Sequence, residues 1–326
     1  MSTTRPRRGL AAVILLSALV LAVVGAAALA GCGSDASAGG EASPAASAAS
    51  DSSAPITVTD GAGATVTLQQ PAARIVSLAP ANTEIAYAIG AGDKMVAGTS
   101  YDDYPEEASS LPKTGDFANP NVEKIASFNP DLVLAAGGIQ DKLRSKLEQL
   151  GMTVYVVDPK TYDGVMTDIT NLGQLAGSMA QAQQVADAML KAKDEVQAQV
   201  ASLSRPATFL EIYSKPLMTA GGRTFIDDMI TLAGGVNLGA TAGSGFPTFS
   251  TEVLFKNDPA VYIADSGSMS QPGDISKRSG FAELTAVKDG HVYVIEDSII
   301  ARPGPRLAEG LQELVKMIHP EAAAAQ

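Results

Sequence analysis

Apolar residues between positions 74 and 158 follow two alternating patterns. Short apolar runs, the pattern of buried strands, occur in RIVSLAP, MVAGTS, DLVLAAG and MTVYVVD. Between them, apolar residues recur every three or four positions, as in NTEIAYAIGAGD and DKLRSKLEQLG, and Asn82 or Thr83 is expected to cap the first of these helices. Strands that alternate with helices predict a parallel α/β sheet.

The same alternation returns after residue 205. ATFLEIY, AVYIAD and HVYVIED predict strands, whereas TFIDDMITLAGG and GPRLAEGLQELVKMIHP predict helices. We therefore expect two Rossmann-like α/β lobes, residues 56–177 and 205–320, followed by a short tail at 321–326.

The segment between the two lobes, residues 178–204, predicts one long helix. It contains neither Gly nor Pro, and Val185, Met189, Val196 and Val200 recur at helical spacing. A helix of this length spans about 40 Å. One alternative is a further packing helix or a short coiled coil, but the position between two α/β lobes favours a single stiff connector.

A repeat links the lobes. FANPNVEKIASFNP starts at Phe117 and FPTFSTEVLFKNDP starts at Phe246, and an aromatic residue, a glutamate, an aliphatic residue and a proline recur at the constant offset of 129 residues. A glutamate followed by an aliphatic residue and a proline is common in α/β chains, but four positions at one offset favour a real structural equivalence.

The repeated residues suggest two roles. Phe117 and Phe246 fall in loops where ligands of open α/β sheets bind, one ring in each lobe, so together they suit a flat or bulky ligand. The alternative is that each ring seals its own lobe. Glu123 and Glu252 fall in the first turn of a helix, where an acid stabilises the helix dipole. Alternatively, one exposed carboxylate in each lobe docks onto a basic membrane partner.

The N-terminus predicts export. A basic head is followed by an apolar run from Gly9 to about Ala30 and by LAGC, which ends at Cys32. LAGC resembles the lipobox of bacterial lipoproteins, which implies a signal peptide at 1–31, lipidation of Cys32 and a location on the outer face of the cytoplasmic membrane. A transmembrane anchor is the alternative. Residues 32–55, rich in Ala, Ser and Gly, predict a flexible tether.

Composition excludes several function classes. The signal peptide carries three of the 23 basic residues and none of the 35 acidic ones, so the mature chain has a net charge of −15, which argues against nucleic acid as a partner. His291 and His319 are the only histidines, too few for a zinc or manganese site. G-x-S-x-G and a dinucleotide-binding G-x-G-x-x-G are absent, so we do not expect an enzyme. The acidic run YDDYPEE predicts a solvated loop.

Several motifs together resemble one family. RIVSLAPANTEIAYAIGAGDK, SYDDYPEEA, GDFANPNVEKI, NPDLVLAA, PLMTAGGRTFIDDMITLAGG and ARPGPRLAEGLQEL are similar to the helix-linked (class III) substrate-binding proteins of ABC importers, which serve cobalamin, ferric siderophores and haem. The resemblance runs from about residue 56 to residue 320. It is strongest with the cobalamin-binding branch, where the motifs around SLAPANTE and YDDYP are typical.

The resemblance implies a monomer with its ligand cleft between the lobes, an ABC permease dimer with its ATPase as partner, and no cofactor. The family's docking glutamates match Glu123 and Glu252. Its pocket positions fall on five residues: Ala81, Tyr101, Phe117, Phe246 and Arg302. Arg306 is expected to cap or brace the last helix.

One departure concerns the ligand. Cobalamin binders place Trp at several pocket positions, whereas this chain has no Trp. A corrinoid is the first expectation. A ferric siderophore or haem is the alternative, and Tyr101 or Tyr104 would be available as a haem ligand. More distant alternatives are an extracytoplasmic enzyme and a structural lipoprotein.

Overall fold

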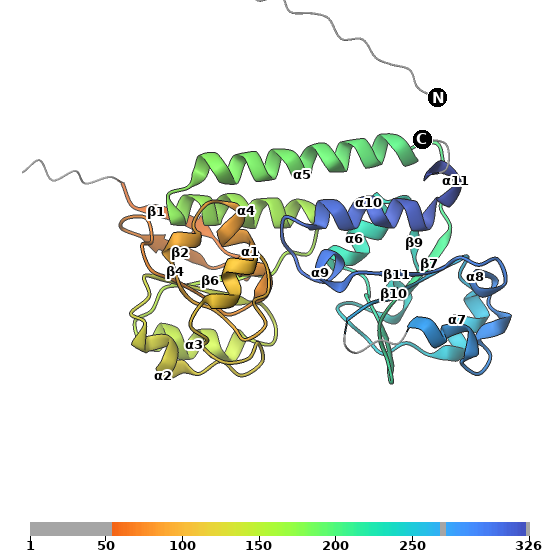
Figure 1. Cartoon of the computed structure of the whole chain (residues 1–326), viewed down its shortest axis with the longest axis horizontal. Coiled ribbons are helices and arrows are strands. Elements are labelled where there is room, and N and C mark those ends of the chain that lie inside the picture. The colour runs from red at the N-terminus through yellow and green to blue at the C-terminus, as the bar shows by residue number, and fades with distance from the viewer. Residues whose placement is uncertain (1–53, 268–271, 324–326) are drawn as a thin grey trace, which may run out of the picture. The chain divides into compact units, whose positions relative to one another are not determined.

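Figure 1 shows the fold of residues 54–267 and 272–323, the parts of the chain that this computed structural model describes. These residues belong to one compact unit. The predicted signal peptide, Cys32, nearly all of the predicted tether and residues 324–326 lie outside the described residues.

The N-terminal lobe is built on a four-stranded parallel sheet in the order β4-β3-β5-β6. Its strands are β3 (Ile75–Ser77), β4 (Met95–Ala97), β5 (Leu132–Ala136) and β6 (Val154–Val157). Its helices are α1 (Pro80–Ala88), α2 (Val122–Ser127), α3 (Asp141–Gln149) and α4 (Tyr162–Ala176). Strands β3, β5 and β6 are buried almost throughout because helices cover the sheet, as their unbroken apolar runs require.

Two features of this lobe differ from the sequence expectations. An antiparallel hairpin, β1 (Ile56–Thr59) and β2 (Thr65–Leu68), precedes the sheet and was not predicted. Helix α1 begins at Pro80 after Ala79, so neither Asn82 nor Thr83 caps it, because proline with its fixed φ already suits the first helical turn.

The C-terminal lobe has a five-stranded sheet in the order β11-β10-β7-β8, with β9 paired to β7. Its strands are β7 (Ala207–Ser214), β8 (Leu217–Thr219), β9 (Val236–Asn237), β10 (Val261–Asp265) and β11 (Val292–Ile295). Its helices are α6 (Phe225–Leu232), α7 (Thr251–Asn257), α8 (Thr285–Lys288), α9 (Asp297–Ile300), α10 (Leu307–Ile318) and α11 (Pro320–Ala323). The predicted two-lobed α/β fold is confirmed. The sheet is mixed rather than fully parallel, because β8 returns antiparallel to β7.

Helix α5 (Met179–Val200) connects the two lobes and packs against α4 and α10 (Figure 1). Its 22 residues span about 33 Å, and it ends four residues before the predicted limit. Its buried face consists of Ala182, Ala186, Met189, Ala192 and Val196. Three of them, Ala182, Met189 and Val196, belong to a core cluster that includes residues of both lobes, so the connector is also a packing helix.

The repeat has a structural counterpart. Helix α7 begins 129 residues after α2, and β10 begins 129 residues after β5. In both helices a glutamate lies in the first turn, while Ile125 and Leu254 are fully buried at the same relative position. Each lobe therefore contains the same unit, in which a short helix buries one aliphatic side chain and is followed by a central strand.

Candidate ligand-binding site

A cavity of about 680 Å³ opens between the lobes, and we call it the inter-lobe cavity. All four strands of the N-terminal sheet contribute to it at their carboxyl ends, through residues 79–82, Tyr101, 136–137 and 157–159. The C-terminal lobe adds Phe225, Phe246 and the segment around Arg302. This is where open α/β sheets bind ligands, and the volume lies within the usual range for small-molecule sites.

All five residues that the sequence assigned to ligand binding line this cavity: Ala81, Tyr101, Phe117, Phe246 and Arg302. Their contact with a ligand stays a prediction. Tyr101 and Phe246 are 58% and 47% exposed, although large aromatic side chains are usually buried. Phe117 is half-buried. The cavity therefore presents aromatic surface from both lobes.

Gln140, which sequence reasoning missed, positions the loop that carries Phe117. Its side chain is 1% exposed and donates to the backbone oxygens of Phe117 and Leu78 at 2.8 and 2.7 Å. Its amide oxygen accepts from the backbone N–H of Ala136 at 2.8 Å. Because the Gln140 side chain is buried, these bonds join the Phe117 loop to the ends of two central strands.

The loop that carries Phe246 is held by close backbone contact. The N–H groups of Gly221 and Gly222 donate to the backbone oxygens of Gly245 and Gly243 at 2.7 and 2.8 Å. A Cβ atom at Gly221 would lie 2.4 Å from the oxygen of Gly243, so only glycine permits this approach.

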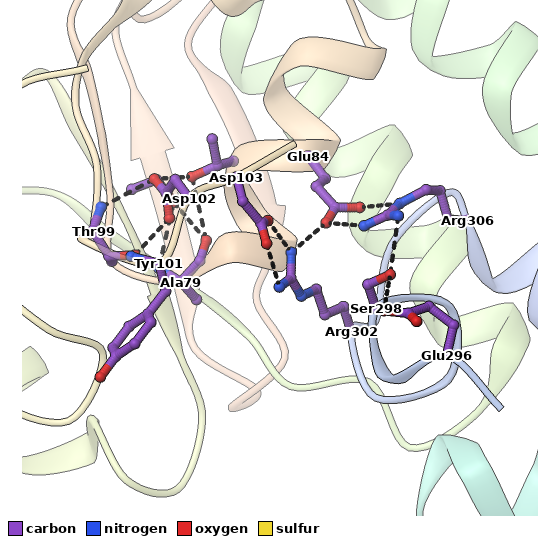
Figure 2. Close-up of polar contacts among 12 residues, drawn as sticks. Ala79, Glu84, Thr99, Tyr101, Asp102, Asp103, Glu296, Ser298, Arg302 and Arg306 are labelled. Atoms are coloured by element: carbon purple, nitrogen blue, oxygen red, sulfur yellow. Dashed lines mark hydrogen bonds and ion pairs between the residues drawn. The ribbon is translucent and has the colours of Figure 1, made fainter. Parts of the chain in front are cut away.

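An ion-pair cluster crosses from one lobe to the other beside the cavity (Figure 2). We call Glu84, Asp103, Arg302 and Arg306 the inter-lobe ion cluster. Arg302 donates to both carboxylate oxygens of Asp103 at 2.5 and 3.1 Å and to Glu84 at 3.1 Å. Arg306 donates to Glu84 at 2.9 and 2.6 Å and to Ser298 at 3.1 Å. The side chain of Glu84 is only 2% exposed.

The charges of this cluster reinforce one another. Hydrogen bonds from Arg302 hold the pKa of Asp103 below its ordinary value, and the hydrogen bonds to Glu84 raise the pKa of Arg306. The guanidinium of Arg306 also lies 4.1 Å from the ring centre of Tyr104, a cation–π contact. Two carboxyl groups and two guanidinium groups therefore join the lobes.

Arg306 occupies the N-cap position of α10, as expected, although its side chain forms no capping hydrogen bond. It also contacts Glu84 of the opposite lobe, so it connects the lobes as well. One expectation from the sequence is wrong here. The run YDDYPEE is not simply a solvated loop, because Asp102 is 4% exposed and accepts hydrogen bonds from Thr83 and Thr99 at 2.8 and 2.5 Å. Buried threonine donors outside the run compensate the desolvation of this carboxylate.

Glu123 and Glu252 are exposed in the first turns of α2 and α7. Neither has an ion-pair partner within residues 54–267 and 272–323. Figure 1 shows α2 and α7 on the same side of this unit, opposite α5. The arrangement leaves one unpaired carboxylate on each lobe at that side, and its role in docking stays a prediction.

The described residues contain no group of three or more His, Cys, Asp or Glu side chains placed to hold a metal ion. His319 ends α10 and is buried, while His291 precedes β11. Of the two tyrosines considered as haem ligands, Tyr101 lines the inter-lobe cavity, whereas Tyr104 lies against Arg306. Within the same residues, no helix combines the length and apolar character needed to cross a bilayer.

Comparison with known proteins identifies the family. Residues 75–299 match the family described as periplasmic binding protein. The chain belongs to this family. It is 32% identical to YvrC, an uncharacterised ABC transporter substrate-binding lipoprotein of Bacillus subtilis, over 97% of this chain and 98% of that protein.

Two solved structures of family relatives are similar across both lobes. The vitamin B12-binding protein BtuF of Vibrio cholerae is 31% identical, with a TM-score of 0.70 over 78% of this chain and 98% of that chain. The haem-binding protein RhuT from Roseiflexus sp. RS-1 is 25% identical, with a TM-score of 0.68 over 76% of this chain and 98% of that chain. This periplasmic binding protein is therefore a substrate-binding component of an ABC transporter, and its relatives are transport proteins rather than enzymes.

Proposed function

We propose that the protein captures a corrinoid in the inter-lobe cavity and delivers it to the permease dimer and ATPase of an ABC importer. The observation that carries this proposal is the cavity wall, where Tyr101, Phe117 and Phe246 present aromatic surface from both lobes. A corrinoid is a large, flat macrocycle, so aromatic rings on both sides can cover its faces. Vitamin B12-binding relatives at about 30% identity support the same ligand class.

The polar groups of the cavity support this choice. Asp116, Asp158 and Asp297 line it, and carboxylates accept hydrogen bonds. A corrinoid carries several primary amides around its ring, and amide N–H groups are suitable donors to these oxygens. Because the tryptophans of the cobalamin binders are missing here, the phenylalanine and tyrosine rings take their place as the flat walls.

Haem is the second candidate, and one observation favours it. The exposed phenol of Tyr101 lies on the cavity wall, where it can serve as an axial ligand to iron. The similarity to a haem-binding protein supports this alternative, and a ferric siderophore in the same cavity is the third.

The proposal includes an anchor and a docking surface. Lipidation of Cys32 would hold the protein at the outer face of the cytoplasmic membrane, since two acyl chains give stable attachment. The exposed Glu123 and Glu252 would pair with basic residues of the permease, one for each lobe. Exposed ion pairs contribute only about 0.2–1 kcal/mol each, so these contacts would orient the complex more than strengthen it.

Calorimetric titration of the full-length chain in detergent, with cyanocobalamin, haemin and ferric siderophores in separate runs, tests the ligand. We expect saturable one-to-one binding of cyanocobalamin that is tighter than binding of the other ligands. The double variant Phe117→Ala and Phe246→Ala should weaken this binding while leaving the far-ultraviolet circular dichroism unchanged. Saturable binding of haemin or a siderophore, with no heat from cyanocobalamin, would show that the corrinoid assignment is wrong.

A further inference from the structure

Arg302 is the only cationic side chain that lines the inter-lobe cavity among the described residues. A pocket arginine ordinarily attracts carboxylates and phosphates, because its fork of N–H donors matches their oxygens. Here, however, the guanidinium already has two carboxylate partners from the N-terminal lobe, as Figure 2 shows. The cation that would recognise an anionic ligand is therefore occupied before any ligand arrives.

The two partners of Arg302 differ in exposure. Glu84 is 2% exposed and also binds Arg306, so it is a fixed part of the connection between the lobes. The side chain of Asp103 is 64% exposed and pairs with Arg302 through both oxygens. Removing the charge of Asp103 would therefore free one side of the guanidinium while Glu84 still holds Arg302 in place.

We propose that Asp103 is a specificity-determining residue, which neutralises Arg302 and so makes the inter-lobe cavity reject ligands that carry an anionic group at this position. The inference rests on the proposed function, because it specifies which ligands that cavity accepts. A carboxylate of the ligand must compete with Asp103 for the N–H donors of Arg302. Once bound there, it is also repelled by the neighbouring carboxylate of Asp103. A neutral amide meets no such repulsion.

The other acids of the cavity wall act in the same direction, although one of them, Asp158, already has a cationic partner in Lys160. Asp116, Asp158 and Asp297 add three acids to its wall. The adjoining cavity, which shares Phe246 with this one, contains Lys160 and Arg223, and Lys160 pairs with Asp158 at 2.5 Å. Arg223 is a cation of the adjoining cavity, and binding of an anion there would bypass Arg302.

Matched ligands test the proposal. Cyanocobalamin and its three monocarboxylic acid derivatives have nearly the same size and shape, but each derivative has one amide replaced by a carboxylate. Calorimetry on the full-length chain in detergent would compare the wild type with Asp103→Asn. Glu106→Gln is the matched control, because it removes one exposed charge from the same loop without contacting Arg302.

We expect the wild type to prefer cyanocobalamin over at least one monocarboxylate by about tenfold or more. In Asp103→Asn that preference should fall at least fivefold, because Arg302 can then pair with the carboxylate, and cyanocobalamin itself should bind within about threefold of the wild type. The control should keep the wild-type preference.

Three results would overturn the proposal. The first is equal wild-type affinity for the amide and all three acids, which means that an anion is accepted, for example at Arg223. The second is an unchanged preference in Asp103→Asn. The third is an equal loss of preference in Glu106→Gln, which would mean that the net charge of the loop, rather than the pairing of Asp103 with Arg302, sets the preference. If the wild type binds no corrinoid, the proposed ligand is wrong. The ratio of affinities for neutral and anionic ligand is then measured with the dimethyl ester of haemin and with haemin itself, which differ only in their carboxylates.

Discussion

Replacing Glu84 by Gln should destabilise the protein substantially. The carboxylate accepts three hydrogen bonds from two arginines of the opposite lobe and is 2% exposed, so its charge has almost no access to water. Glutamine keeps the shape but removes the charge, and its NH2 group would face guanidinium donors.

The magnitude follows from this burial. Breaking a buried ion pair by removing one partner costs about 3–5 kcal/mol. The arginine side chains are 18% exposed and Arg302 keeps its bonds to Asp103, so part of the cost is relieved by water and by that carboxylate. We therefore expect the free energy of unfolding to fall by about 2–4 kcal/mol in Glu84→Gln.

Urea unfolding, followed by circular dichroism, measures this change. The urea midpoint should fall while the slope of free energy against urea stays the same, because the surface exposed on unfolding does not change. Glu195→Gln is the control, since Glu195 pairs with Lys191 at 3.7 Å and both side chains are more than 60% exposed. This control should cost at most about 0.5 kcal/mol.

A double-variant cycle identifies the partner. Glu84→Gln and Arg306→Gln should cost less together than the sum of the two single changes, by about 0.5–3 kcal/mol, because each single change already breaks the same contact. A loss in Glu84→Gln no larger than that of the exposed control, or costs that simply add, would refute the claim that this buried contact holds the lobes together.

Three further results are expected. Phe117→Ala and Phe246→Ala should each weaken corrinoid binding by about 10- to 100-fold in calorimetry, because both residues line the cavity. Glu123→Arg and Glu252→Arg should leave ligand affinity in solution unchanged but stop uptake into cells that carry the permease. Burial raises the pKa of Asp168 to about 7, so its contribution to stability is fully present at low pH and is lost as the pH rises towards 7. The difference in unfolding free energy between the wild type and Asp168→Asn should thus fall by about 1.4 kcal/mol per pH unit near pH 5, and by about half as much per unit near pH 7.

Each of these predictions has a control or an outcome that would contradict it. Unchanged corrinoid affinity in both phenylalanine variants would mean that the rings only seal their own lobes. Glu195→Arg reverses a charge on α5, away from α2 and α7, and should leave uptake normal. Loss of ligand affinity in either docking variant would contradict the docking role. The difference in unfolding free energy between the wild type and Asp168→Asn is compared at each pH. If this difference does not change between pH 5 and 7, the pKa of Asp168 is not raised in the folded protein.

Local patterns in the chain were sufficient to predict the two α/β lobes, the helix between them and the unit that repeats after 129 residues. Each depends on neighbours within a few positions, since burial on a strand or a helix face imposes a short period on apolar residues. Ile125 and Leu254 show this, because each is the buried aliphatic residue of a short helix in the repeat. The cavity residues Tyr101, Phe117 and Phe246 were found through that repeat and through the family motifs.

Other features depended on the tertiary structure, because no local period encodes them. Glu84 and Arg306 lie 222 positions apart in the chain, and their pairing depends on how the lobes meet. Asp102 is buried because threonines from two different segments surround it, although its acidic neighbours predicted a solvated loop. Arg302 is the clearest case. The family motif predicted a pocket arginine at this position, but only the folded structure shows that its guanidinium pairs with Asp103 and Glu84. The charge that a cavity offers to a ligand depends on which side chains the fold brings together. Ion pairs between residues that are far apart in the chain produce no local sequence pattern, so they cannot be predicted from one.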